Sequence, residues 1–213
     1  IKAGDIAIVC GDLGLLWCKD KEFEYNLNFF EGLPITILWV QGNHENYDMI
    51  KEYPLEEWNG GLARHIIKDK LILLERGQIF NIQGKTFFTF GGAESHDITD
   101  GILDRNNPNF KNQIKLLKLN KKKQYRIIGE SWWQEELPSE EELKTGLRNL
   151  KSINNKVDYI ITHCAPDEIY GNDKKSILNK LVLNVEFNPR NGQFTNGDYI
   201  KYFSKECIYE SCT

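Results

Sequence analysis

The stretch that decides the fold is Ile35-Thr36-Ile37-Leu38-Trp39-Val40-Gln41-Gly42-Asn43-His44-Glu45. Residues 35–40 form a short, almost wholly apolar run, and the chain turns polar directly after it. An apolar run of this length is typical of a strand buried on both faces, as in a sheet covered by helices. The segment therefore predicts a buried strand that carries Asn43 and His44 at its carboxyl end.

Two further segments repeat this arrangement. Residues 5–10 are a second short, largely apolar run, and residues 157–162 are a third. Ligands of α/β sheets bind beyond the carboxyl ends of the strands, because the loops there converge on one crevice. We therefore expect one site formed by the polar residues at these strand ends, which are Asp12, Asn43, His44 and His163. Carboxylate, amide and imidazole donors together suit a divalent ion such as Mn, Fe, Zn, Ni or Co.

Helical patterns fill the gaps near both ends of the chain. Residues 23–30 carry apolar side chains at i, i+4 and i+7 and predict a helix. Ser139 and Glu142 predict a capping box at the start of another helix. One face of that helix is expected to be lined by Leu143, Leu147 and Leu150. Residues 196–203 predict a last helix.

The middle of the chain has a different pattern. Residues 71–74, 79–82 and 86–90 are short strand-like runs, and they predict meander hairpins rather than βαβ units. Helices and strands at both ends with hairpins between them indicate a mixed α/β fold. Without repeats or low-complexity linkers, residues 1–213 are expected to form a single domain.

The bulk composition excludes several classes of protein. The 213 residues are 40% hydrophobic and 27% charged, as expected for a soluble globular domain. A net charge of -4 gives no general attraction to nucleic acid or to an anionic membrane surface. No apolar run approaches the roughly 20 residues of a membrane span. The five cysteines are an odd number without a C-x-x-C pair, which favours a reduced, cytoplasmic protein over a disulfide scaffold.

The lysine-rich segment 115–126 has two interpretations. A solvated surface face is the favoured one. Binding of nucleic acid or another phosphate-rich substrate is the alternative, but no regular aromatic residues accompany the lysines. His65 has no candidate metal-ligand partner in the sequence, and we interpret it as structural.

The strand-end motifs resemble those of the calcineurin-like metallophosphoesterase family. They are Gly11-Asp12-Leu13-Gly14, Gly42-Asn43-His44-Glu45 and Thr162-His163-Cys164-Ala165-Pro166. The Gly-Asn-His-Glu element is the most specific of the three. The resemblance covers essentially the whole chain, and residues 91–97 and 131–150 are similar to a bacterial branch of small proteins. It implies a four-layer α/β/β/α sandwich of two mixed sheets flanked by helices.

The resemblance also assigns roles to the four residues. It implies hydrolysis of a phosphate ester, either a monoester or a diester, by a metal-bound hydroxide that two divalent ions generate. Asp12 would bridge the two ions, and Asn43 and His163 would bind the second ion. His44 would bind no metal and would instead stabilise the developing charge or protonate the leaving oxygen.

Two residues near the end of the third hairpin strand are less defined. His96 and Asp97 either bind substrate or belong to a plain surface turn, and the sequence supports both interpretations equally.

The sequence departs from the family pattern near both ends. It lacks two motifs of the family, Asp-x-His and Gly-His-x-His. Asp5 is no substitute for the first, because Ala7 stands in place of the histidine. The second ion would keep three ligands and the first only Asp12. We therefore expect a domain that is incomplete at both ends, lacks its terminal strands and is inactive by itself. The alternatives are an inactive relative that serves as a binding or scaffold module, and a nuclease, which only segment 115–126 supports.

Overall fold

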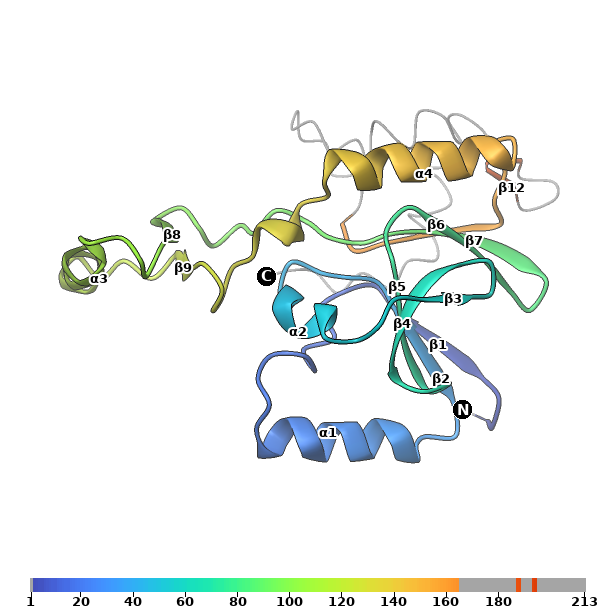
Figure 1. Cartoon of the computed structure of the whole chain (residues 1–213), viewed down its shortest axis with the longest axis horizontal. Coiled ribbons are helices and arrows are strands. Elements are labelled where there is room, and N and C mark those ends of the chain that lie inside the picture. The colour runs from blue at the N-terminus through green and yellow to red at the C-terminus, as the bar shows by residue number, and fades with distance from the viewer. Residues whose placement is uncertain (1, 165–186, 189–192, 195–213) are drawn as a thin grey trace.

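The computed structural model describes residues 2–164 and two short paired strands, β11 (Phe187–Asn188) and β12 (Gln193–Phe194). The chain forms a mixed α/β structure around two main sheets (Figure 1). The helix expected over residues 196–203 lies outside the described residues. In the part that is described, no helix has both the length and the apolar character that crossing a bilayer requires.

The larger sheet has five strands in the order β1-β2-β5-β4-β3. Their bounds are β1 Ile6–Val9, β2 Thr36–Trp39, β5 Leu71–Leu74, β4 Gly61–Ile67 and β3 Glu56–Trp58. The predicted strands within residues 5–10 and 35–40 are confirmed. The predicted meander is wrong for residues 71–74, because β5 pairs in parallel with β2 and its antiparallel partner is β4. The chain reaches β5 through the short helix α2 (Tyr47–Lys51) and the β3–β4 hairpin.

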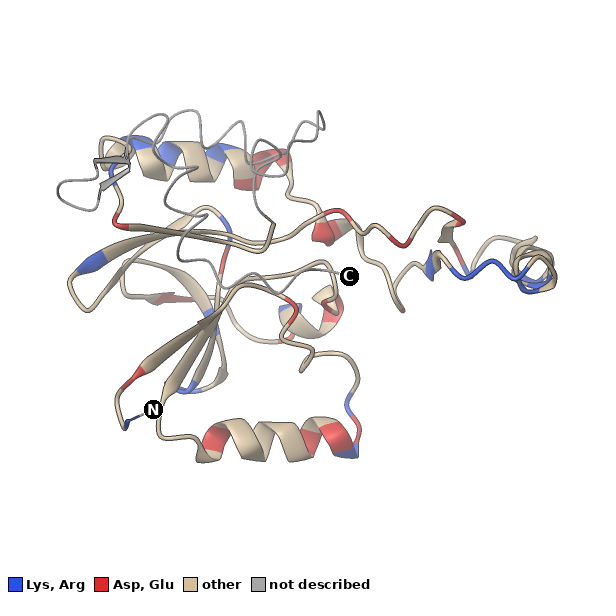
Figure 2. Cartoon of the chain, turned by 180° about the vertical axis from the view of Figure 1, so that it is seen from behind, with Lys and Arg blue, Asp and Glu red and all other residues tan. Residues whose placement is uncertain are grey.

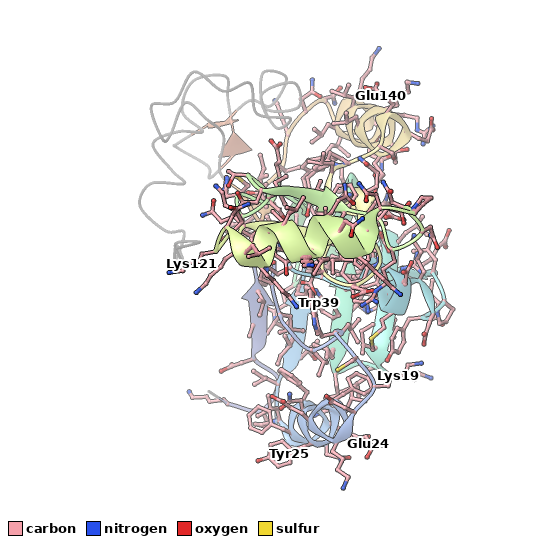
Figure 3. All side chains as sticks on the ribbon, turned by 90° about the vertical axis from the view of Figure 1, so that its left-hand side faces the viewer. Lys19, Glu24, Tyr25, Trp39, Lys121 and Glu140 are labelled. Atoms are coloured by element: carbon pink, nitrogen blue, oxygen red, sulfur yellow. The ribbon has the colours of Figure 1, made fainter. Side chains whose placement is uncertain are left out.

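Strands β2 and β5 are buried on both faces because each lies between two hydrophobic layers. Successive side chains of a strand point to opposite faces. One layer includes Phe23 of helix α1 (Lys21–Gly32) and the strand residues Ile37, Trp39, Leu71 and Leu73. The other includes Phe80 and Ile82 of the second sheet with Leu38, Val40, Ile72 and Leu74. Figure 3 shows Trp39 between two helices. One is α1, which carries the labelled Glu24 and Tyr25, and the other is the helix that begins at Glu140.

The smaller sheet has three strands in the order β10-β7-β6. Their bounds are β10 Tyr159–Thr162, β7 Lys85–Phe90 and β6 Gln78–Ile82. The β6–β7 hairpin is confirmed, and its turn residues Gln83 and Gly84 both have positive φ, as a tight two-residue hairpin turn requires. The predicted strand within residues 157–162 is also confirmed, as β10 runs parallel to β7.

Helix α4 (Glu140–Ser152) packs on β6, on the side away from the larger sheet (Figure 1). The capping box of Ser139 and Glu142 is confirmed. The predicted apolar face is only partly correct, since Leu150 is fully buried whereas Leu147 is exposed. A Cβ on Gly77 would lie 2.8 Å from the backbone nitrogen of Gly146. Helix α4 therefore packs directly against the backbone of the turn between β5 and β6.

An arm, defined here as residues 98–130, projects away from both sheets (Figure 1). It consists of β8 (Gly101–Leu103), α3 (Phe110–Leu119) and β9 (Tyr125–Ile127), and the chain returns through the 3-10 helix η1 (Gln134–Glu136). No residue of α3 is buried, and the lysines of segment 115–126 are exposed. Figure 2 shows blue Lys and Arg positions along the arm. The interpretation of that segment as a solvated face holds for its lysines but is wrong for Arg126, which is 5% exposed.

Candidate active site

The predicted site lies where strands of both sheets end. Asp12 and Asn43 follow β1 and β2 of the larger sheet, and His163 follows β10 of the smaller one. The ends of β2 and β7 are joined directly, because the Gly92 N–H donates to the Gln41 carbonyl at 2.6 Å. The two sheets therefore present their carboxyl ends to the same place.

Two glycines allow the loops of the site to meet. A Cβ on Gly42 would lie 1.9 Å from Asp12 Oδ1 and 2.5 Å from the Asp12 backbone nitrogen. A Cβ on Gly11 would lie 2.1 Å from His163 Nδ1. Neither approach is sterically possible with any other residue unless the loops move apart. The glycines of the Gly-Asp and Gly-Asn-His motifs therefore have a structural reason in this chain.

Asp12 is held in one orientation by its neighbour across the site. The His44 backbone N–H donates to Asp12 Oδ1 at 2.9 Å, and Asp12 itself adopts a left-handed conformation with φ of 51°. Asp12 Oδ2 is turned the other way and lies 3.6 Å from His163 Nε2. One carboxylate oxygen is thus fixed by the backbone while the other faces the predicted ligands.

His163 presents its second ring nitrogen to the same point. Nδ1 lies 2.7 Å from the Cys10 carbonyl oxygen, which can only accept, so Nδ1 carries a proton. Nε2 lies 3.0 Å from Asn43 Oδ1, and with the Asp12 oxygen this brings three different donor atoms for a metal together. A histidine that ligates a metal through one nitrogen commonly donates its other N–H to a backbone carbonyl in this way.

Asn43 is oriented by two buried residues that sequence reasoning missed. Its Nδ2 donates to Ser95 Oγ at 3.2 Å, and Ser95 Oγ donates to Glu136 Oε2 at 2.7 Å. The Ser95 backbone N–H occupies the other Glu136 oxygen at 2.9 Å. Because the amide nitrogen is engaged, the amide oxygen is directed at His163.

The His44 side chain is exposed beside this cluster and contacts the arm. Arg126 Nη2 lies 3.2 Å from His44 Nδ1 and 3.1 Å from Nε2. The same guanidinium donates to both oxygens of Asp97, at 2.7 and 2.8 Å, and these hydrogen bonds lower the pKa of that carboxyl. His96 is exposed. Substrate binding by His96 and Asp97 stays a prediction.

A buried carboxyl group, Glu45, also borders the site. Its side chain is 1% exposed, and burial, together with the negative charge of Asp12, raises its pKa to about 8. The Leu13 N–H donates to Glu45 Oε1 at 3.2 Å. Burial therefore favours the protonated form of Glu45.

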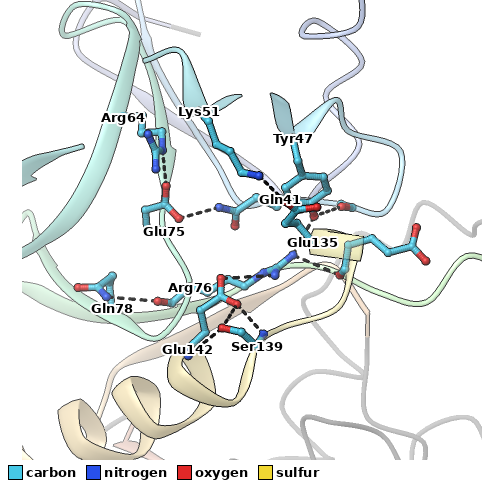
Figure 4. Close-up of polar contacts among 12 residues, drawn as sticks. Gln41, Tyr47, Lys51, Arg64, Glu75, Arg76, Gln78, Glu135, Ser139 and Glu142 are labelled. Atoms are coloured by element: carbon cyan, nitrogen blue, oxygen red, sulfur yellow. Dashed lines mark hydrogen bonds and ion pairs between the residues drawn. The ribbon is translucent and has the colours of Figure 1, made fainter. Parts of the chain in front are cut away.

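A second layer of hydrogen bonds supports the Gly42 turn from below. The Tyr47 hydroxyl donates to the Gly42 carbonyl at 2.7 Å and accepts from Arg76 Nη2 at 2.8 Å. Figure 4 shows Arg76 beside Tyr47. It also shows a separate set of hydrogen bonds, in which Arg64 and Gln41 both donate to Glu75. These contacts fix the loop that carries the predicted ligand and the predicted catalytic histidine.

The donor set fits one divalent ion better than two. Asp12, Asn43 and His163 supply an oxygen, an oxygen and a nitrogen, a combination that suits the metals predicted from the sequence. Among the described residues, no group of three or more His, Cys, Asp or Glu side chains could hold a metal. For the first ion of the predicted pair, those residues offer Asp12 alone. His65 does not contribute, since it lies in β4 with its ring 6.4 Å from that of Trp58, consistent with a structural role.

Comparison with protein families gives one finding. The family described as calcineurin-like phosphoesterase matches residues 1–202, a range that includes all four residues of the predicted site. Comparison with the curated proteins and with the solved structures gives no match.

Proposed function

This chain belongs to the calcineurin-like phosphoesterase family, and on that premise we propose that it hydrolyses a phosphate ester with the help of divalent metal ions. The convergence of Asp12 Oδ2, Asn43 Oδ1 and His163 Nε2 supports the proposal most strongly. We also propose that α1, the two sheets and α4 form the four-layer α/β/β/α sandwich of the family.

Each site residue has a role in this proposal. Asp12, Asn43 and His163 would hold one ion, and Asp12 would also serve a second. When bound, such ions supply Lewis acidity, which activates water and neutralises charge on the phosphoryl group. The Ser95–Glu136 pair keeps the Asn43 oxygen turned toward the metal, and Cys10 keeps the lone pair of His163 on Nε2.

His44 serves the substrate rather than the metal. Its backbone N–H orients Asp12, and its side chain is exposed, where a phosphoryl group bound at the cluster can reach it. A ring N–H donates to a phosphoryl oxygen or passes its proton to the leaving oxygen, which balances the negative charge that develops there.

A second candidate function is binding of a phosphate ester without turnover. The ligand count favours it, because the described residues give the first ion no protein ligand besides Asp12. Nuclease activity is a third candidate, and the exposed lysines of the arm are its only support.

The test is hydrolysis of p-nitrophenyl phosphate and bis(p-nitrophenyl) phosphate by the protein expressed from its complete gene. After treatment with EDTA, we expect turnover to return with added Mn²⁺ and to be lost in Asp12→Asn. Asp69→Asn is the matched control, since Asp69 also has a left-handed conformation (φ of 58°) but lies in the β4–β5 turn. Tight Mn²⁺ binding with no turnover of either substrate would instead favour the binding module.

A further inference from the structure

Arg126 is a buried charge on an arm that is mostly exposed. It lies in β9, 82 residues after His44, and is 5% exposed although the lysines before it are on the surface. Arginine stays charged in proteins, so burying its guanidinium is costly unless its donors are satisfied. The partners that satisfy it are Asp97, the Ser131 carbonyl at 2.8 Å and the His44 ring.

The contact with His44 involves both ring nitrogens. Arg126 Nη2 lies 3.2 Å from Nδ1 and 3.1 Å from Nε2, so the guanidinium faces the ring as a whole rather than one of its nitrogens. A guanidinium only donates hydrogen bonds. Its position against both ring nitrogens limits the orientations that the His44 ring can adopt.

Asp97 holds the guanidinium of Arg126 in the orientation in which it contacts the His44 ring. It accepts from Nε and Nη2 at 2.7 and 2.8 Å, a two-point contact that sets the plane of the guanidinium. Lysine, with a single point charge on a flexible stem, cannot hold both Asp97 and the His44 ring in this way.

We propose that Arg126 is a positioning residue for His44, through which the arm becomes part of the active site. This inference rests on the proposed phosphoesterase function. Arg126 keeps the His44 ring in place, so that the ring is oriented for contact with a phosphoryl oxygen. Asp97 then acts in support of Arg126 instead of binding substrate.

The experiment compares Arg126→Ala and Arg126→Lys with Arg105→Ala. Arg105 is a matched control because it lies on the same arm, but its side chain is exposed and pairs with Glu130. We expect both Arg126 variants to lower kcat on p-nitrophenyl phosphate by about 10- to 100-fold, as for other groups that orient a functional side chain, with little change in KM. Added guanidinium ions should restore part of the kcat of Arg126→Ala, and Arg105→Ala should match the wild type.

A second readout does not depend on activity. Ring signals of His44 in the metal-free protein, assigned with His44→Gln, should be single and sharp in the wild type, as expected for a ring held in one orientation. In Arg126→Ala they should shift and broaden, as expected for a ring that samples several orientations. If the wild type hydrolyses neither substrate, the proposed function fails, while this spectrum still decides whether Arg126 positions the ring.

Asp97→Asn keeps the inference testable if Arg126→Ala does not fold. It releases the guanidinium without changing side-chain volume, and we expect it to lower kcat and to alter the His44 signal in the same direction. The inference is overturned if the His44 signals of Arg126→Lys and Asp97→Asn equal those of the wild type. If the wild type is active, the inference is also overturned when the Arg126 variants have the same kcat as Arg105→Ala.

Discussion

Gly42→Ala tests the geometry of the site without requiring any assay of activity. The added Cβ would lie 1.9 Å from Asp12 Oδ1 and 2.5 Å from the Asp12 backbone nitrogen. A side-chain oxygen could turn aside, but a backbone nitrogen cannot, so the loops that carry Asp12 and Asn43 must separate. The change should therefore lower both the stability of the fold and its affinity for metal.

The expected magnitude follows from the cost of overpacking. Forcing a methyl group into a closely packed site typically costs about 1–3 kcal/mol. For a chain of this size each kcal/mol lowers Tm by roughly 2–4 °C, so we expect a decrease of about 2–12 °C. Bound metal adds stability by mass action, about 2.7 kcal/mol at a concentration of 100 times Kd. The wild type should gain that stabilisation with Mn²⁺, and Gly42→Ala should lose most of it.

The assay is thermal unfolding in EDTA and in a series of Mn²⁺ concentrations. Gly32→Ala is the control, because Gly32 ends α1 and a Cβ there would meet no atom within 4 Å. It should change stability by less than about 1 kcal/mol and keep the full response to Mn²⁺. The reasoning is refuted if Gly42→Ala unfolds at the wild-type temperature and responds to Mn²⁺ as the wild type does.

Four substitutions test the roles of individual residues. His44→Ala should lower kcat by about 10²–10⁴-fold, the usual contribution of a general acid, and leave metal content unchanged; loss of bound metal by elemental analysis would contradict its assignment. Asp12→Asn should weaken Mn²⁺ binding in calorimetry more than Asn43→Ala does, because only Asp12 contributes negative charge and serves both ions. A larger loss of affinity in Asn43→Ala would exclude Asp12 as the bridging ligand. Ser95→Ala should reduce Mn²⁺ affinity by about 10–100-fold, since it leaves the Asn43 amide without its acceptor, and an unchanged affinity would show that the hydrogen bond does not orient the ligand.

The strands and their terminal motifs were predictable because their signals are local. A continuous apolar run followed by polar residues identifies β1, β2 and β10, and the fold then brings Asp12, Asn43 and His163 together. The capping box of α4 was predictable for the same reason, since Ser139 and Glu142 are three residues apart.

The remaining features depend on contacts between distant segments. β5 was assigned to the wrong kind of pairing because a four-residue apolar run carries no information about which strand lies beside it. Arg126 looks like its lysine neighbours in sequence, and only its contact with a residue 82 positions away sets it apart. Glu136 likewise looks like its neighbour Glu135 in sequence, although it is 1% exposed and accepts a hydrogen bond from Ser95.

The central claim is that Asp12, Asn43 and His163 hold the metal ion on which hydrolysis depends. Its most direct test is the initial rate of p-nitrophenyl phosphate hydrolysis against Mn²⁺ concentration for the wild type, His163→Gln and His65→Gln. We predict that His163→Gln needs at least about tenfold more Mn²⁺ for half-maximal rate, or shows no turnover, while His65→Gln follows the wild-type curve. Turnover that is independent of Mn²⁺, or a His163→Gln curve that coincides with the wild type, would contradict the claim.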